Sequence, residues 1–143
     1  MEVKTNSAKE SQKVAQKFAR DIKGGDVIAL YGDLGSGKTI FVQGLAKGLK
    51  IKRKITSPTF VFMRSYPFSR DKKTLTFYHL DLYRGEEMSD FKSLGLDEIF
   101  SEDAVVVLEW ADKIKSALPK KRIDIFIENA GQNKRKIKIK RSK

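Results

Sequence analysis

The chain has 143 residues, with 30 lysines and arginines against 18 aspartates and glutamates, so its formal net charge is +12. This length favours a single domain over residues 1–143 with a core of its own. Cysteine is absent, which excludes disulfides and thiolate metal sites, and no apolar run approaches the ~20 residues that span a bilayer. Because the N-terminus also lacks an apolar signal region, we expect a cytoplasmic protein without membrane contact.

The first third of the chain predicts a helix, a strand and a second helix. Residues 7–22 carry apolar side chains at every fourth position, and Gly24-Gly25 marks the end of that helix. An apolar run of strand length follows at 26–31. Residues 38–49 again show helical spacing, so this part of the chain alternates between helix and strand.

The remainder predicts further strands and one more helix. The expected strands are residues 59–66, 75–83, 104–108, 122–128 and 135–141. A polar turn between the first two indicates an antiparallel pair, and a helix is expected at 86–94. The run at 104–108 is the most apolar of the chain, which predicts a central strand buried on both faces. The whole order indicates an α/β fold with a mixed parallel and antiparallel sheet flanked by helices.

The most informative segment is residues 32–39, Gly-Asp-Leu-Gly-Ser-Gly-Lys-Thr, which match the phosphate-binding pattern G-x-x-x-x-G-K-[ST] without substitution. The strand before and the helix after supply the context that this pattern requires. Its glycines let successive backbone N–H groups face a phosphate, and the helix N-terminus adds partial positive charge. Lys38 can reach the β- and γ-phosphates, and the Thr39 hydroxyl can bind Mg²⁺. The expected nucleotide contacts here are Leu34, Gly35, Ser36, Gly37, Lys38, Thr39 and Ile40.

Glu109 is the first candidate for an acidic partner of the metal. It directly follows the apolar run 104–108, which is the general form of a Walker B strand. If that strand neighbours the one before the phosphate loop, Glu109 lies near Thr39 and can hold Mg²⁺ directly or through water. The alternative is a carboxylate at a strand end that faces solvent.

Asp81 is the second candidate, within His79-Leu80-Asp81-Leu82-Tyr83-Arg84. On a strand, His79 and Asp81 share one face. The Asp81 carboxylate can bind Mg²⁺ through water or orient the attacking water, whereas a structural pair between Asp81 and Arg84 is an equal alternative from spacing alone. The pattern assigns no chemistry to His79.

Ser57-Pro58-Thr59 lies between the second helix and the next strand, where many P-loop nucleotidases sense the γ-phosphate. The Thr59 hydroxyl can bind phosphate or water on Mg²⁺, and Thr59 therefore joins the expected nucleotide contacts. A Ser-Pro turn that enters a strand explains these residues equally well. For Trp110, which follows Glu109, position alone favours packing.

Four motifs, in this order and in so short a chain, closely resemble the TsaE (YjeE) family, the bacterial ATPases of tRNA threonylcarbamoyladenosine biosynthesis. The motifs are Gly-Asp-Leu-Gly-Ser-Gly-Lys-Thr at 32–39, Ser-Pro-Thr-Phe at 57–60, His-Leu-Asp-Leu-Tyr-Arg at 79–84 and Leu-Glu-Trp at 108–110. The resemblance covers about residues 5–128. It implies a three-layer domain like that of other P-loop NTPases, with ATP and Mg²⁺ as cofactors.

The resemblance also implies a partner, a heterodimer of the TsaB and TsaD type. ATP use would support repeated rounds of threonylcarbamoyl transfer to adenosine 37 of tRNA, and hydrolysis would be weak without the partner. By matching motif, Lys38 and Thr39 would hold phosphate and Mg²⁺, and Glu109 would be a ligand of Mg²⁺. Asp81 would be the second essential acid, so the implied catalytic residues are Lys38, Asp81 and Glu109. Trp110 would lie beside the site.

One departure from the family pattern is Ile40, where some members have a second threonine. Its backbone N–H still serves a phosphate, so we expect little loss of binding.

The end of the chain is strongly basic, since seven of the ten residues 134–143 are lysine or arginine. Their alternation with isoleucine predicts an edge strand whose lysines face water and discourage edge pairing. The alternative is contact with tRNA phosphates, which would weaken as salt rises. The basic cluster 50–54 has the same two explanations. Because no RNA-binding module is recognisable, we expect only indirect or weak tRNA contact and no DNA partner.

Two other classes of P-loop protein are alternatives, a small-molecule kinase and a GTP-driven switch. A kinase needs an acceptor pocket and usually a mobile lid, for which 143 residues leave little room. Residues 81–84 lack the glycine of the GTPase pattern D-x-x-G, and Lys136 stands where N-K-x-D has its guanine-reading aspartate. Adenine is therefore favoured. A binding module that uses ATP only to set its shape also fits the sequence.

Overall fold

The protein folds as an α/β domain built on one mixed sheet, as the sequence predicts. The computed structural model describes residues 1–33, 35–53, 55, 63–82 and 95–142. Within these residues seven strands follow the order β1-β7-β6-β2-β5-β4-β3. The strands are β1 (Glu2–Thr5), β2 (Val27–Tyr31), β3 (Met63–Arg70), β4 (Lys73–Asp81), β5 (Ala104–Glu109), β6 (Ile123–Gly131) and β7 (Lys134–Arg141). The helix expected at 86–94 and the start of the strand expected at 59–66 lie outside the described residues.

The centre of the sheet is parallel and both of its sides are antiparallel. β2 is parallel to β5 on one side and to β6 on the other, and β5 is also parallel to β4. β3 runs antiparallel to β4, β7 runs antiparallel to β6, and β1 runs antiparallel to β7. The carboxyl ends of four parallel strands therefore meet at one edge, which is where open α/β sheets bind ligands.

The pair of strands expected around the polar turn is confirmed as a β3–β4 hairpin, with different boundaries. β3 continues to Arg70 and β4 begins at Lys73, so the turn has only two residues. Asp71 and Lys72 have φ of 52° and 66°, and positive φ at both positions matches the twist of the flanking strands. Pro67 is tolerated within β3 because this strand is at the edge of the sheet.

The expectation that the basic C-terminal segment forms an edge strand is wrong. β7 pairs with β6 on one side and with β1 on the other, where Val3 lies opposite Ile137. The outer strand β1 contains a single apolar residue among four and shows no pattern of its own, so only its pairing with β7 makes it a strand. Lys138 is nevertheless exposed, as expected for the lysines of this segment.

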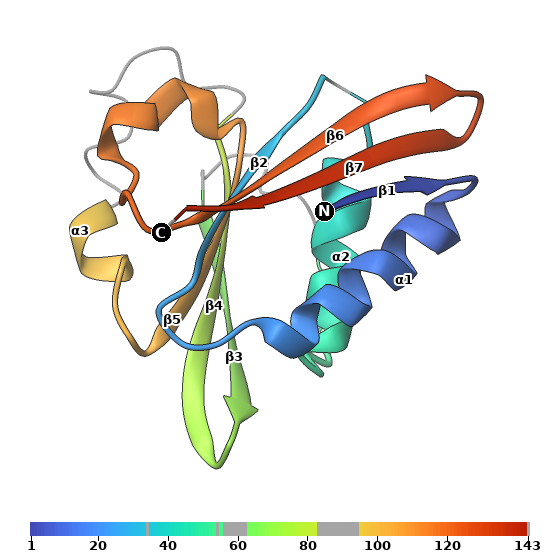
Figure 1. Cartoon of the computed structure of the whole chain (residues 1–143). Coiled ribbons are helices and arrows are strands. Elements are labelled where there is room, and N and C mark those ends of the chain that lie inside the picture. The colour runs from blue at the N-terminus through green and yellow to red at the C-terminus, as the bar shows by residue number, and fades with distance from the viewer. Residues whose placement is uncertain (34, 54, 56–62, 83–94, 143) are drawn as a thin grey trace.

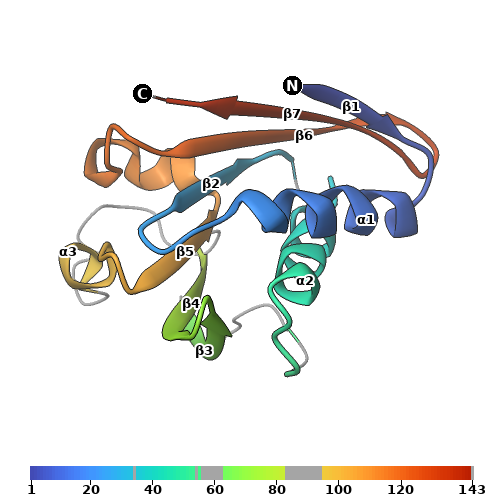
Figure 2. The ribbon, with the colours of Figure 1, turned by 60° about the horizontal axis from the view of Figure 1, so that its bottom comes forward.

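Helices cover both faces of the sheet, so the domain has three layers, with the sheet in the middle (Figures 1 and 2). α1 (Ala8–Phe18), its extension η1 (Ala19–Asp21) and α2 (Lys38–Gly48) lie on one face. α3 (Leu96–Ile99) and η3 (Ala111–Ala117) lie on the other. Among the described residues, no helix combines the length and hydropathy that crossing a bilayer requires.

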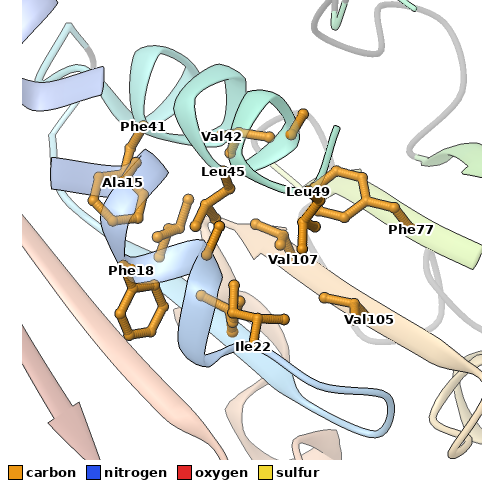
Figure 3. Packing of buried hydrophobic residues seen from close by; sticks show 14 of the residues in the cluster. Ala15, Phe18, Ile22, Phe41, Val42, Leu45, Leu49, Phe77, Val105 and Val107 are labelled. Atoms are coloured by element: carbon orange, nitrogen blue, oxygen red, sulfur yellow. The ribbon is translucent and has the colours of Figure 1, made fainter. Parts of the chain in front are cut away.

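The described residues form two hydrophobic cores, one on each face of the sheet. β5 contributes to both, because Val105 and Val107 face α1 and α2 whereas Val106 and Leu108 face α3 and η3. Figure 3 shows Val105 and Val107 beneath side chains of α1 and α2, with Phe77 beside them. All six residues of β5 are buried, which confirms the prediction of a central strand buried on both faces.

Close contact between α1 and α2 fixes the position of the helix that follows the phosphate loop. A Cβ atom at Gly44 would lie 2.5 Å from the backbone oxygen of Gln12, and one at Gly48 would lie 2.6 Å from the Cβ of Ala19. Any larger residue at either position would push the helices apart. The two glycines of α2 therefore allow the helices to approach each other closely.

Candidate phosphate-binding site

The glycine-rich segment 32–39 connects β2 to α2 at the carboxyl edge of the sheet. Gly35 and Gly37 have φ of 80° and 101°, the left-handed region that favours glycine. Gly37 is the N-cap of α2, and Ser36 donates its backbone N–H to the Asp33 oxygen at 2.9 Å. The strand, loop and helix that the pattern requires are thus in place. Leu34 lies outside the described residues.

Lys38 is buried at the start of α2, with only 5 % of its surface exposed. Its ammonium donates to the backbone oxygens of Gly32, at 2.5 Å, and Asp33, at 3.0 Å. Burial lowers the pKa of Lys38 below its ordinary value of 10.5, and the Glu109 carboxylate is the largest influence that opposes this shift. A buried ammonium beside the backbone of such a loop is suited to pair with phosphate oxygens.

Thr39, in the first turn of α2, is in contact with Glu109, the last residue of β5. The Thr39 hydroxyl donates to the two carboxylate oxygens of Glu109 at 3.3 and 3.5 Å. Glu109 ends β5, where it lies opposite Leu30 of β2, and only 2 % of it is exposed. It is therefore not the solvent-facing carboxylate of the alternative explanation. A hydroxyl and a carboxylate in contact are hard oxygen donors, which suit Mg²⁺.

Asp81 brings a second carboxylate to the same edge. In the register of β4 and β5, Asp81 lies opposite Glu109, and each residue ends its strand. The backbone N–H of Leu82 donates to the backbone oxygen of Glu109 at 3.1 Å, which extends this pairing by one residue. Arg84, the other partner proposed for Asp81, lies outside the described residues, as does Thr59.

His79 is a residue of this site to which the sequence assigned no role. It is fully buried, and its Nε2 lies 2.5 Å from Oε2 of Glu109. His79 precedes Asp81 by two positions, so both side chains leave β4 on one face. That alternation was visible in the sequence. The contact itself depends on β5 lying beside β4, and no local pattern indicates this.

Trp110 contributes both packing and a contact with the loop. It follows Glu109 with φ of 61° and is the N-cap of η3. Its ring packs against the core beneath η3, and the Lys38 ammonium lies 4.0 Å from the ring centre. That distance is typical of a cation–π contact. The left-handed backbone turns the chain sharply after β5 and thereby directs this ring toward the loop.

A cavity of about 340 Å³ adjoins the loop at the end of β2, beside residues 126–129 of β6. Its lining includes Asp33 and Ser36 of the loop together with Phe126 and Asn129 of β6. Phe126 stacks on Tyr31 with ring centres 4.9 Å apart. Aromatic walls with a few polar groups are common in ligand sites.

The known proteins that this chain resembles point to one family. Residues 5–137 match the family model described as Threonylcarbamoyl adenosine biosynthesis protein TsaE. A tRNA threonylcarbamoyladenosine biosynthesis protein TsaE of Bacillus subtilis strain 168 is 42% identical over 134 residues, 94% of this chain and 81% of that protein. The protein of the same name from Treponema pallidum strain Nichols is 35% identical over 135 residues, 94% of this chain and 96% of that protein.

A solved structure has a similar fold. The crystal structure of Bacillus subtilis YdiB superposes on this fold with a TM-score of 0.79 and 37% identity. The superposition covers 99% of this chain and 84% of the other. The family match spans most of the chain, and the alignments cover 81% and 96% of the two relatives. The chain therefore belongs to the TsaE family.

Proposed function

We propose that this protein is a Mg²⁺-dependent ATPase that serves the tRNA threonylcarbamoyladenosine modification machinery. The observation that carries the proposal is the contact between Thr39, which begins α2 with Lys38, and the buried Glu109 at the end of β5. A phosphate-binding loop with a hydroxyl and a carboxylate in contact beside it is the arrangement that holds a nucleotide with its metal. The names of the relatives supply the pathway.

The donor set fits Mg²⁺ well. Thr39 and Glu109 would hold the ion, with phosphate oxygens and water completing its coordination. When bound, Mg²⁺ neutralises charge on the β- and γ-phosphate oxygens. Lys38 neutralises further phosphate charge with an ammonium that is already desolvated. Asp81 lies opposite Glu109 in the sheet, and we propose that its carboxylate would orient water.

The remaining contacts that we propose surround the nucleotide. Backbone N–H groups from Gly35 to Ile40 would bind phosphate oxygens, as would Leu34 before them, and the Ser36 N–H would exchange the Asp33 oxygen for phosphate. The Thr59 hydroxyl would sense the γ-phosphate. The α2 N-terminus favours the same anion through its partial positive charge.

The partner that we propose is a heterodimer of the TsaB and TsaD type in the cytoplasm. ATP hydrolysis by this protein would support turnover of that complex, and tRNA would be contacted only indirectly or weakly. Since hydrolysis would be coupled to the partner, the isolated chain should turn over slowly.

We expect ATP hydrolysis by the purified chain to rise several-fold or more when the TsaB–TsaD-type heterodimer from the same source is added. The measurement is steady-state phosphate release with and without the heterodimer, and Glu109→Ala serves as the variant that should abolish the stimulated rate. Equal turnover in both samples would contradict the partner while leaving a P-loop nucleotidase. Transfer of phosphate to a metabolite in place of water would instead indicate a kinase.

His79→Ala is expected to lower hydrolysis at least about tenfold and to leave ADP affinity measured without Mg²⁺ within about twofold. Because His79 contacts Glu109, its loss should free the carboxylate and leave the phosphate cradle in place. The two measurements are phosphate release at saturating ATP and ADP binding in the presence of a chelator. His79→Gln, which retains a donor, should recover part of the rate; a rate for His79→Ala equal to that of the unmodified chain would show that Glu109 needs no such support.

A further inference from the structure

Arg135 joins the basic C-terminal strand to the phosphate loop. Its Nε donates to the backbone oxygen of Ser36 at 2.7 Å, and its Nη2 lies 3.4 Å from the backbone oxygen of Gly35. These residues are about a hundred positions apart in the chain. Arg135 is half-buried on the face of β7 that also carries the buried Ile137, which is the face covered by α1 and α2.

The contact has a geometric consequence for the inner side of the loop. The Ser36–Gly37 peptide is trans, and in a trans peptide the C=O and the N–H point in opposite directions. When Arg135 holds the Ser36 oxygen on the outer side, the Gly37 N–H must therefore point away from Arg135. The preceding peptide shows the same relation, because the Gly35 oxygen faces Arg135 while the Ser36 N–H turns to the Asp33 oxygen.

Gly37 makes this orientation useful for binding. It has φ of 101° and caps α2, so its N–H belongs to the donors at the helix N-terminus that a phosphate would meet. A loop whose peptides already have this orientation gives up less conformational freedom when it binds. The guanidinium also places a permanent positive charge in hydrogen-bond contact with the loop backbone, and this charge favours anion binding further.

We propose that Arg135 is a positioning residue for nucleotide binding, which holds the phosphate loop in its binding conformation from β7. This inference rests on the proposed function of the same loop. Because Arg135 donates to backbone oxygens of the loop, we expect it to act on affinity and to leave the chemical step unchanged.

The test compares Arg135→Gln, Arg135→Lys and a matched control, Lys138→Gln, in the full chain. Lys138 is exposed on the opposite face of β7, so its substitution removes the same charge from the same strand without touching the loop. The measurements are the dissociation constant for ADP, and KM and kcat for ATP hydrolysis. Thermal unfolding of each nucleotide-free variant reports on the fold.

Arg135→Gln is expected to raise Kd and KM about tenfold with kcat within about twofold, the effect of losing one hydrogen bond to a charged group. Lys138→Gln should change none of these more than about twofold, as expected for an exposed charge. Arg135→Lys should fall between them, because an ammonium keeps the charge and can donate to the Ser36 oxygen but lacks the planar fork.

Three results would overturn the proposal. If Arg135 only stabilised the fold, Arg135→Gln would reduce the fraction of folded, active protein. The apparent kcat would then fall in proportion and KM would stay unchanged. If the unmodified chain binds ADP and Arg135→Gln binds it equally well, the role of Arg135 fails while the proposed function stands. A chain that binds no ADP in its unmodified form would overturn both, so the two failures are distinguishable.

Discussion

Glu109→Gln is expected to lower ATP hydrolysis by about 10²- to 10³-fold, the usual loss when one preorganised electrostatic group is removed from an active site. The substitution keeps the shape of the side chain and can keep a hydrogen bond to Thr39, but it removes the negative charge. That charge lies at the buried end of β5, where the surroundings screen it weakly. We therefore expect its loss to lower the affinity for Mg²⁺ far more than it lowers the stability of the fold.

Nucleotide binding should separate from hydrolysis in this variant. Without Mg²⁺, ADP affinity is expected to stay within about threefold of that of the unmodified chain, because the loop and Lys38 are intact. Phosphate release at saturating ATP and ADP titration in a chelator measure the two quantities. Glu98→Gln, which neutralises an exposed carboxylate on α3, is the matched control. Hydrolysis by Glu109→Gln at the rate of Glu98→Gln would remove Glu109 from the mechanism.

Lys38→Ala is expected to weaken ADP and ATP binding by at least about a hundredfold, because each hydrogen bond between charged groups contributes roughly 1.5–3 kcal/mol and Lys38 can make two to the phosphates. The burial that lowers the pKa of Lys38 also means that its ammonium has already lost most of its water. Pairing with phosphate would then require little further desolvation, which makes this cation worth more than one at the surface.

Calorimetric titration with ADP, and with a slowly hydrolysed ATP analogue, measures the effect. Lys47→Ala is the matched control, because Lys47 lies in the last turn of the same helix and is exposed. It should leave affinity within about twofold, since charges near a helix end are worth only a few tenths of a kcal/mol. Affinity for Lys38→Ala comparable to that for Lys47→Ala would contradict phosphate binding at this loop.

The elements closest to the loop were predictable because the information that forms them is local. The apolar run of β2, the glycines at 35 and 37 and the helical spacing of α2 occupy one continuous segment. Positive φ at a glycine and an N-terminal helix turn depend on a few neighbouring residues. The buried strand β5 was equally clear, because a strand covered on both faces carries a short, continuous run of apolar residues.

Boundaries set by pairing were less predictable. β3 and β4 extend further toward their turn than the polar residues there suggest, because two residues suffice once both adopt positive φ. β1 carries no strand pattern, and its partner β7 lies at the opposite end of the chain. The prediction of β7 as an edge strand failed for that reason: alternation reports which faces are buried, whereas edge position depends on whether another segment reaches the strand.

The sequence by itself determined the phosphate loop, its strand and helix, the buried strand that ends at Glu109, and the family resemblance. Only the tertiary structure decided that β5 lies between β2 and β4, which brings Glu109 into contact with Thr39 and His79 and opposite Asp81. It also decided that Arg135 reaches the loop from β7. The physical reason is that these contacts join residues 30 to about 100 positions apart. Local spacing encodes which face a side chain leaves from, but the order of strands in the sheet determines which side chains meet.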